Sequence, residues 1–310
     1  MGLMFIVGRA GSGKTHFCLR EIAQRQLKSS NEKLFYIVPE QYTLQAEKDL
    51  IGLTENGVIM RAQVLSFSRL CYNILSLNGG LNKTPLSDTG KALVIRKIIS
   101  ENMDKFLYFQ NCAGRFSFTE QVCATITELF KYGVSPENLS MSFENETSSV
   151  MFMKAHDIGI IYKQFIKYMS EGYISSETSL DMLYSSMEDS SFVSDGEIWL
   201  DGFSSFTPQE LKIIERLIKS AKNVFITLTI NKAAVNNPNL SETSVFYQTK
   251  KTYSQIVKLA EKIGVNVSVK YMGEPLRFKT DGLKNLENGF LYHNPSQNKC
   301  GTEIEIYSAD

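Results

Sequence analysis

The feature that most constrains this sequence is the octapeptide at positions 8–15, GRAGSGKT, which fits the pattern GxxxxGK[ST]. An apolar run from Leu3 to Val7 comes directly before it, and a helical pattern follows from about Lys14 to Gln26. A strand, a glycine loop and a helix in this order begin a parallel α/β sheet. The sequence therefore predicts a phosphate-binding loop that opens an α/β domain.

The composition of this loop suits phosphate for a physical reason. Glycines let consecutive backbone N–H groups point inward at phosphate oxygens without a Cβ clash. Lys14 has the reach to contact the β- and γ-phosphates, the Thr15 hydroxyl is placed to ligate Mg²⁺, and the helix adds the positive end of its dipole. The predicted nucleotide-binding residues are therefore Gly8, Arg9, Ala10, Gly11, Ser12, Gly13, Lys14 and Thr15.

A magnesium nucleotide also needs an acidic residue at the end of a neighbouring strand. The best candidate is Asp201, which ends the apolar segment EIWLD and would hold the metal through water. The alternative is an ordinary strand-end turn formed with Gly202. Many such enzymes place a water-activating glutamate after the aspartate, but here Gly202 follows, and Glu210 is better explained as a helix-capping residue. The sequence thus favours ATP and Mg²⁺ binding over turnover and assigns no catalytic residue.

The α/β pattern occurs in two separated stretches of the chain. In the first, strands are expected at 34–38 and 58–65 and a helix at 43–52; in the second, strands at 197–201, 224–230, 265–270 and 303–307 and helices at 208–221 and 245–263. Between them lie helical candidates at 66–77, 89–102, 118–132, 136–139 and 150–171, and a serine-rich loop at 185–196. We therefore expect one α/β domain, 1–65 plus 195–310, interrupted by an all-helical insertion at 66–194.

Charge and cysteine usage exclude several classes of protein. With 33 basic and 33 acidic residues the formal net charge is zero, which excludes binding of nucleic acid by bulk charge but not by a local groove. No apolar run approaches the roughly 18 residues of a membrane-spanning helix, and no secretory leader is evident. The five cysteines are scattered without a CxxC pair, so neither a disulfide scaffold nor a structural zinc site is expected. These features indicate a cytoplasmic protein without a membrane partner.

Beyond the phosphate-binding loop, three segments carry a more specific resemblance. They are VPEQYTLQAE at 38–47, VLSFSRL at 64–70 and DGFSSFTPQE at 201–210. In order and approximate spacing the chain resembles AddB, one of the two chains of bacterial AddAB helicase–nucleases. The resemblance implies a RecA-like core of the superfamily 1 helicase type with a helical insertion, in agreement with the split α/β pattern.

The same resemblance implies a function and partners. The family works as a heterodimer with an AddA-type helicase–nuclease subunit, and it processes double-stranded DNA ends for recombinational repair. AddB contributes a nuclease domain and recognises a single-stranded Chi sequence, while its own helicase motifs are degenerate. With 310 residues this chain is too short for the nuclease domain and its iron–sulfur cluster. We therefore expect an N-terminal portion of an AddB protein that binds ATP, is a weak or inactive motor and lacks nuclease activity.

Single-stranded DNA contacts are expected where related helicases place them, after the second and third strands. By position the candidates are Gln41, Tyr42, Ser66, Phe67 and Arg69, with Tyr42 or Phe67 stacking on a base and Arg69 on phosphate. The alternative for Phe67 is a core position, because it shares helical spacing with Leu70 and Ile74. Two other functions stay open at this point: an active P-loop ATPase or phosphotransferase unrelated to DNA, and an interaction scaffold whose P-loop no longer binds nucleotide.

Overall fold

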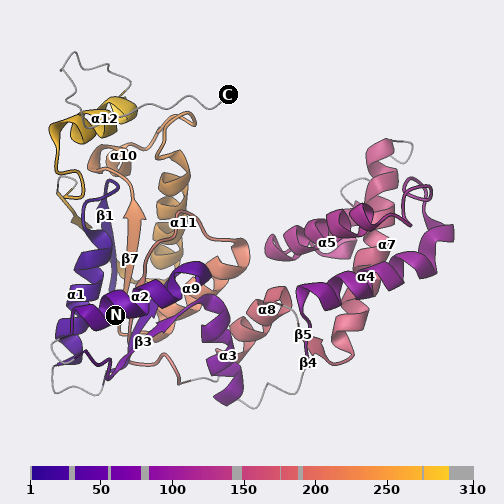
Figure 1. The fold of residues 1–310 in the computed structure, drawn as a ribbon, viewed down its shortest axis with the longest axis horizontal. Coiled ribbons are helices and arrows are strands. Elements are labelled where there is room, and N and C mark those ends of the chain that lie inside the picture. The colour runs from indigo at the N-terminus through magenta and orange to yellow at the C-terminus, as the bar shows by residue number, and fades with distance from the viewer. Residues whose placement is uncertain are drawn as a thin grey trace. The chain divides into compact units, whose positions relative to one another are not determined.

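The computed structural model describes residues 2–27, 32–54, 57–77, 84–141, 149–174, 176–187, 191–273 and 276–292. The strand expected at 303–307 lies outside these residues. The chain divides into two compact units (Figure 1), which we call the sheet unit (Met1–Ser66, Val193–Phe206 and Leu217–Asp310) and the helical unit (Phe67–Phe192 and Thr207–Arg216).

The sheet unit is built on a six-stranded, all-parallel sheet with the order β3-β2-β6-β7-β1-β8. Its strands are β1 (Gly2–Gly8), β2 (Leu34–Ile37), β3 (Ala62–Leu65), β6 (Glu197–Leu200), β7 (Asn223–Thr229) and β8 (Asn266–Tyr271). Every residue of β2 and β6 is buried, as expected for parallel strands covered on both faces. The prediction of an α/β protein with a parallel sheet is confirmed.

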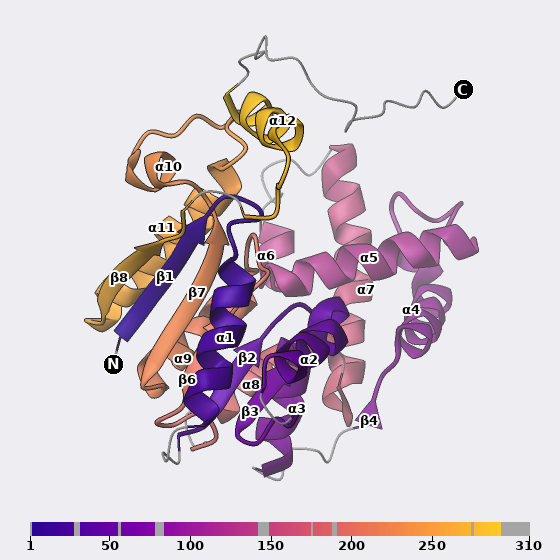
Figure 2. The same cartoon turned by 60° about the vertical axis from the view of Figure 1, so that its left-hand side comes forward.

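The connections between strands run in two directions along the sheet. From β1 to β2 and β3 the chain passes through α1 (Lys14–Gln26) and α2 (Thr43–Gly52), whereas from β7 to β8 it passes through α11 (Tyr247–Ile263). Because such crossovers are right-handed, α1 and α2 cover one face and α11 covers the other, as Figure 2 shows. The connection that leaves β1 runs toward β2, whereas the connection that leaves its neighbour β7 runs the other way, toward β8. In open α/β sheets, ligands bind in the crevice at the carboxyl ends of two such strands.

A buried apolar cluster fastens α1 and α2 to the sheet. It includes Ile22 of α1, Leu50 of α2 and Tyr36 of β2. On the neighbouring strands β6 and β7, the rings of Trp199 and Phe225 stack with centroids 4.8 Å apart. This packing fixes the amino end of α1 relative to the ends of the central strands.

The helical unit contains α3 (Phe67–Leu77), α4 (Asp88–Asn102), η2 (Met103–Lys105), α5 (Phe116–Lys131), α6 (Pro136–Met141), α7 (Val150–Ser170) and α8 (Ser176–Ser186). It also contains two short parallel strands, β4 (Thr84–Pro85) and β5 (Tyr173–Ile174). The expectation of an all-helical insertion is therefore wrong in this detail, because a two-residue strand is too short to produce a periodic pattern. Asp157, fully buried on α7, accepts backbone hydrogen bonds from residues 107–109 and anchors the segment after η2.

Several boundaries differ from the sequence-based expectations. β3 begins at Ala62 rather than at position 58, and α8 extends to Ser186, inside the stretch expected to be a loop. The helices α10 (Lys232–Asn236) and α12 (Asp281–Tyr292) and the 3-10 turn η1 (Glu40–Tyr42) were not expected, whereas α9 (Pro208–Ser220) lies where a helix was expected. None of the described helices is long and apolar enough to cross a membrane.

Candidate nucleotide site

The phosphate-binding loop joins the end of β1, the strand between β7 and β8, to the start of α1. Gly11 and Gly13 have φ angles of +75° and +83°, a left-handed conformation that favours glycine. The backbone N–H of Phe17 donates to Gly13 O at 2.8 Å, so the hydrogen-bond pattern of α1 begins directly at the last glycine of the loop. A Cβ atom on Gly11 would lie 2.8 Å from Cβ of Arg277. The loop thus has the curled backbone that the GxxxxGK[ST] pattern requires.

Lys14 is held against this loop. Its ammonium group donates to the carbonyl oxygens of Gly8 and Arg9, each at 2.9 Å. The pKa of Lys14 falls from 10.5 to about 8, mainly because the ammonium group is buried; the Asp201 charge opposes this fall and the Arg277 charge adds to it. At neutral pH the side chain is therefore still mostly protonated, and it can exchange its carbonyl partners for phosphate oxygens.

Asp201 follows β6 and is 2% exposed. The Tyr36 hydroxyl donates to its Oδ2 atom at 2.6 Å, and the Thr227 hydroxyl donates to its Oδ1 atom. Tyr36 lies on β2 and Thr227 on β7, the two strands that flank β6. Burial, together with the Asp201 charge, raises the pKa of Tyr36, so its hydroxyl keeps its proton. Both partners fix the carboxylate facing the phosphate-binding loop.

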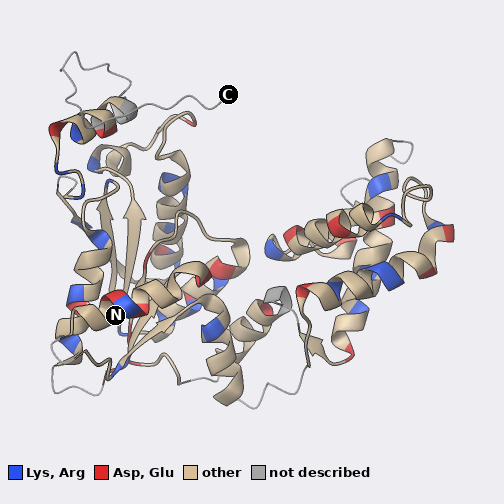
Figure 3. Ribbon diagram, viewed as in Figure 1, with Lys and Arg blue, Asp and Glu red and all other residues tan. Residues whose placement is uncertain are grey.

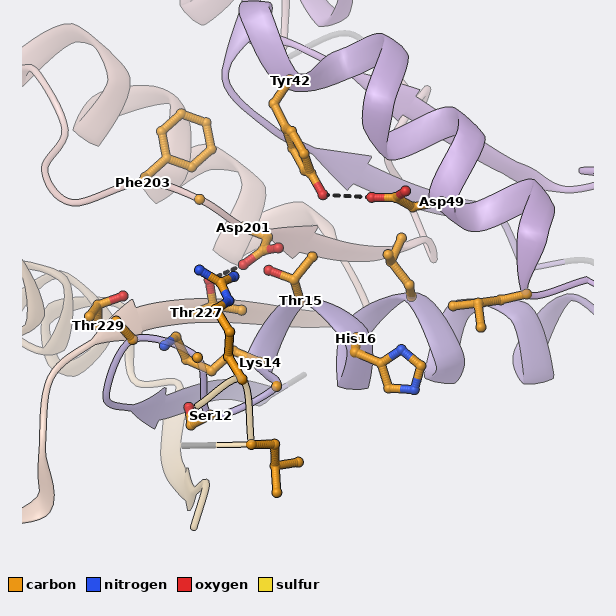
Figure 4. A pocket seen from close by; sticks show the side chains of 18 of the residues that line it. Ser12, Lys14, Thr15, His16, Tyr42, Asp49, Asp201, Phe203, Thr227 and Thr229 are labelled. Carbon is orange, nitrogen blue, oxygen red and sulfur yellow. Dashed lines mark hydrogen bonds between the residues drawn. The ribbon is translucent and has the colours of Figure 1, made fainter. Parts of the chain in front are cut away.

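A cavity of about 960 Å³ connects these groups. It is lined by residues 10–16 of the loop and α1, by residues 201–204, by Thr227 and Thr229 of β7, by the second half of α2, and by Leu276 and Arg277. Figure 4 shows Lys14, Thr15, Asp201 and Thr227 around the same space. Its volume lies at the upper end of the range for small-molecule sites. The cavity is therefore large enough for a whole nucleotide.

The chemistry of the site fits a nucleotide-bound Mg²⁺ rather than a metal held by protein alone. The described residues contain no group of three or more His, Cys, Asp or Glu side chains that could hold an ion. Mg²⁺ commonly keeps several waters and takes its remaining ligands from one or two protein groups and from phosphates. Thr15 offers a hydroxyl, and each oxygen of Asp201 retains a lone pair after accepting one hydrogen bond. Asp201 can thus hold a metal-bound water.

The segment after β8 lies on the phosphate-binding loop. The backbone N–H groups of Leu276 and Arg277 both donate to Gly11 O, at 2.9 and 3.1 Å. Farther along, Glu287 of α12 forms an ion pair with Arg9 at 3.3 Å. Nothing in the sequence pattern indicated this arrangement, because residues 276–287 carry no motif that points to a phosphate site.

Two other acidic residues, Glu210 and Asp49, have structural partners. Glu210 accepts a hydrogen bond from the Thr207 backbone N–H at 2.7 Å, and the Thr207 hydroxyl accepts one from the Glu210 N–H at 3.2 Å. This is a capping box, as the sequence predicted. Asp49, which lines the same cavity, accepts hydrogen bonds from Tyr42 at 2.9 Å and Gln45 at 2.7 Å.

The five residues expected at DNA lie in different environments. Gln41 and Arg69 are exposed, and Tyr42 is half-buried and lines the cavity described above. Ser66 and Phe67 are buried, with 2% and 7% exposure, and for Phe67 this favours the core alternative. Arg69 and Phe67 belong to the helical unit and the other three to the sheet unit. Figure 3 shows basic and acidic residues interspersed along the helices of both units.

Comparison with known proteins gives consistent results. The family model described as "ADDB, N-terminal" matches residues 5–287. The B subunit of an ATP-dependent helicase/deoxyribonuclease from Alkaliphilus oremlandii is 33% identical over 314 residues, covering 99% of this chain and 27% of that protein. Proteins of the same description from Caldanaerobacter subterraneus subsp. tengcongensis and Bacillus mycoides are each 36% identical, covering 94% and 93% of this chain and 25% of each relative.

The chain thus spans about a quarter of the length of these curated relatives. The family match includes the phosphate-binding loop from Gly8 to Thr15, Asp201 and the segment from Leu276 to Glu287. The family model covers well over half of the chain, and the relatives are each more than 30% identical to it over most of its length. The chain therefore belongs to the AddB N-terminal family.

Proposed function

We propose that this chain is a RecA-like nucleotide-binding domain, with the helical unit as its insertion, and that it binds ATP together with Mg²⁺. The observation that carries the proposal is the convergence of Lys14, Thr15 and Asp201 on one cavity next to a left-handed glycine loop. Backbone N–H groups of the loop and Lys14 would hold the phosphates. Thr15 would ligate Mg²⁺, and Asp201 would hold one of its waters.

The site supports binding better than hydrolysis. Among the described residues that line the cavity, the carboxylates are Asp49 and Asp201. Asp201 is fixed by two hydroxyl groups, and Asp49 is engaged by Tyr42 and Gln45. Gly202 stands where a water-activating glutamate would follow the magnesium aspartate. The proposed domain therefore binds ATP, turns it over slowly and is a weak or inactive motor.

The names of the relatives suggest the larger setting. They are described as subunits of ATP-dependent helicase/deoxyribonucleases, and the word "subunit" points to a partner chain. We propose that the full-length protein pairs with an AddA-type helicase subunit to process DNA ends for recombinational repair. Within this chain the exposed Gln41 and Arg69 are the best placed of the expected DNA residues. We expect no nuclease activity from these 310 residues.

Thermal unfolding with Mg-ATP tests the binding proposal. A ligand that binds only the folded state at about a hundred times its Kd stabilises that state by about 2.7 kcal/mol. We expect ATP to raise the melting temperature of the wild-type chain but not that of Lys14→Ala. In parallel, phosphate release should stay near background, and steady release that is lost in Asp201→Asn would instead favour a working ATPase.

A further inference from the structure

Arg277 occupies an unusual position for a surface arginine. It lines the nucleotide cavity together with Lys14 and Asp201, although it comes from the segment after β8. Its backbone N–H donates to Gly11 O at 3.1 Å, and its Cβ atom lies 2.8 Å from where a Gly11 Cβ would stand. The start of its side chain is therefore fixed against the phosphate-binding loop.

Among the described residues, no carboxylate forms an ion pair with the Arg277 guanidinium, whereas Arg9 on the same loop pairs with Glu287 at 3.3 Å. Arg277 also lies near enough to Lys14 for its charge to lower the Lys14 pKa. Two cations that face one cavity repel each other, and a multiply charged anion between them relieves that repulsion.

We propose that Arg277 contacts the terminal phosphate of a bound nucleoside triphosphate and makes the site prefer triphosphates to diphosphates. The inference rests on the proposed function, because it concerns the same nucleotide. Lys14 and the magnesium position near Asp201 mark the β- and γ-phosphate end of the site. A guanidinium binds phosphate through two parallel N–H groups, and such charge-assisted hydrogen bonds are stronger than neutral ones.

The contacts of the neighbouring backbone explain how the arginine is held there. Leu276 N–H donates to Gly11 O at 2.9 Å, beside the bond from Arg277. The ion pair between Arg9 and Glu287 ties α12 to the same loop. Arg277 thus belongs to a segment that is fastened to the loop on both sides of it, so its side chain needs little reorganisation to meet a phosphate.

The test compares ATP and ADP affinities of the whole chain, measured by calorimetric titration in the presence of Mg²⁺. Arg277→Ala should weaken ATP binding by about tenfold or more, the range expected for a charged hydrogen bond, while ADP affinity changes less than about threefold. Arg277→Lys should recover part of the loss. Lys279→Ala removes an exposed positive charge two residues away that does not line the cavity, and should leave both affinities unchanged.

The outcomes separate this inference from the proposed function. If the wild-type chain binds ATP and Arg277→Ala has the same ratio of ATP affinity to ADP affinity as the wild type, the proposed role of Arg277 is wrong. The proposal that the chain binds nucleotide would not be affected by that result. An equal loss of ATP and ADP affinity would also overturn it, because it would indicate a structural role for the arginine. If the wild-type chain binds neither nucleotide, the proposed function fails first.

Discussion

The Tyr36 hydroxyl donates a hydrogen bond of 2.6 Å to Oδ2 of Asp201, from the strand next to the one that Asp201 follows. Both side chains are buried. Thr227 donates to the other oxygen from the opposite side. Three neighbouring strands therefore cooperate to place one carboxylate beside the phosphate-binding loop.

Removing the Tyr36 hydroxyl should cost stability. In Tyr36→Phe the buried Asp201 loses one of its two hydroxyl donors, and we expect a loss of about 1.5–3 kcal/mol in the free energy of unfolding, measured by urea denaturation. Tyr42→Phe is the matched control, because Tyr42 also donates to an aspartate but is only half-buried, and it should cost less than about 1 kcal/mol. Equal losses of stability in the two variants would show that burial does not make the Tyr36–Asp201 bond more stabilising than the Tyr42–Asp49 bond.

The pKa of Lys14, about 8, predicts how ATP affinity depends on pH. If the protonated ammonium is the form that binds phosphate, affinity for ATP should fall about tenfold between pH 7 and pH 9.

The same pKa also affects folding stability. The folded-state pKa of Lys14 lies below the ordinary value of 10.5, so between about pH 8 and 10.5 Lys14 keeps its proton in the unfolded chain and loses it in the folded chain. The ATP-free protein should therefore gain stability across that window while it loses affinity. Lys14→Arg, which keeps its charge, should show a flat affinity profile; the same decline in that variant would exclude Lys14 as its cause.

A side chain at Gly11 should disturb the site more than one at another left-handed glycine. Gly11→Ala combines a φ of +75° with a contact of 2.8 Å to Cβ of Arg277, whereas Gly57→Ala has a φ of +64° and open space around it. The left-handed backbone alone costs about 1–2 kcal/mol. We expect that cost in both variants, and in Gly11→Ala an additional loss of stability and of ATP affinity. Similar denaturation curves and similar affinities for the two would contradict the close packing of Arg277 on the loop.

Asp157 should be a main stabilising residue of the helical unit. It is fully buried and accepts backbone hydrogen bonds from Leu107 at 2.8 Å and from Tyr108 and Phe109 at 2.9 Å. Asp157→Ala leaves these donors without their acceptor and should cost about 3 kcal/mol or more, with faster amide exchange at residues 107–109. Asp104→Ala, at an exposed position nearby, should change stability by less than about 0.5 kcal/mol. Unchanged exchange at 107–109 in Asp157→Ala would contradict this role.

The sequence predicted the parts of the site that depend on local order along the chain. The strand before Gly8, the helix from Lys14 to Gln26 and the strand ending before Asp201 all have clear apolar patterns or glycine signals, and the structure has them at nearly the expected positions. Tyr36 and Thr227 could not be predicted as partners of Asp201, because their proximity depends on the strand order β2-β6-β7. That order is set by packing between distant segments rather than by any local pattern.

Other features could not be predicted because their sequence signals are too short or because their positions depend on contacts between distant segments. The paired strands β4 and β5 contain two residues each, too few for alternation to be recognised. Arg277 lies before α12 in a segment without a recognisable motif, and long-range contacts such as the backbone bonds from Leu276 and Arg277 to Gly11 O bring it to the phosphate-binding loop. Ser66 and Phe67 were expected at DNA from their place after the third strand, but the apolar face of α3 buries Phe67 as it buries Leu70 and Ile74.

Nucleotide binding at the loop from Gly8 to Thr15 is most directly tested by calorimetric titration of Mg-ATP into the purified 310-residue chain. Lys14→Ala removes an ammonium group that lines the cavity, while Lys258→Ala removes an exposed lysine on α11 outside the cavity. We predict saturable binding at one site per chain for the wild type and for Lys258→Ala, and no measurable binding for Lys14→Ala. Binding of Mg-ATP to Lys14→Ala with wild-type affinity, or no binding to the wild-type chain, would contradict the assignment of this site.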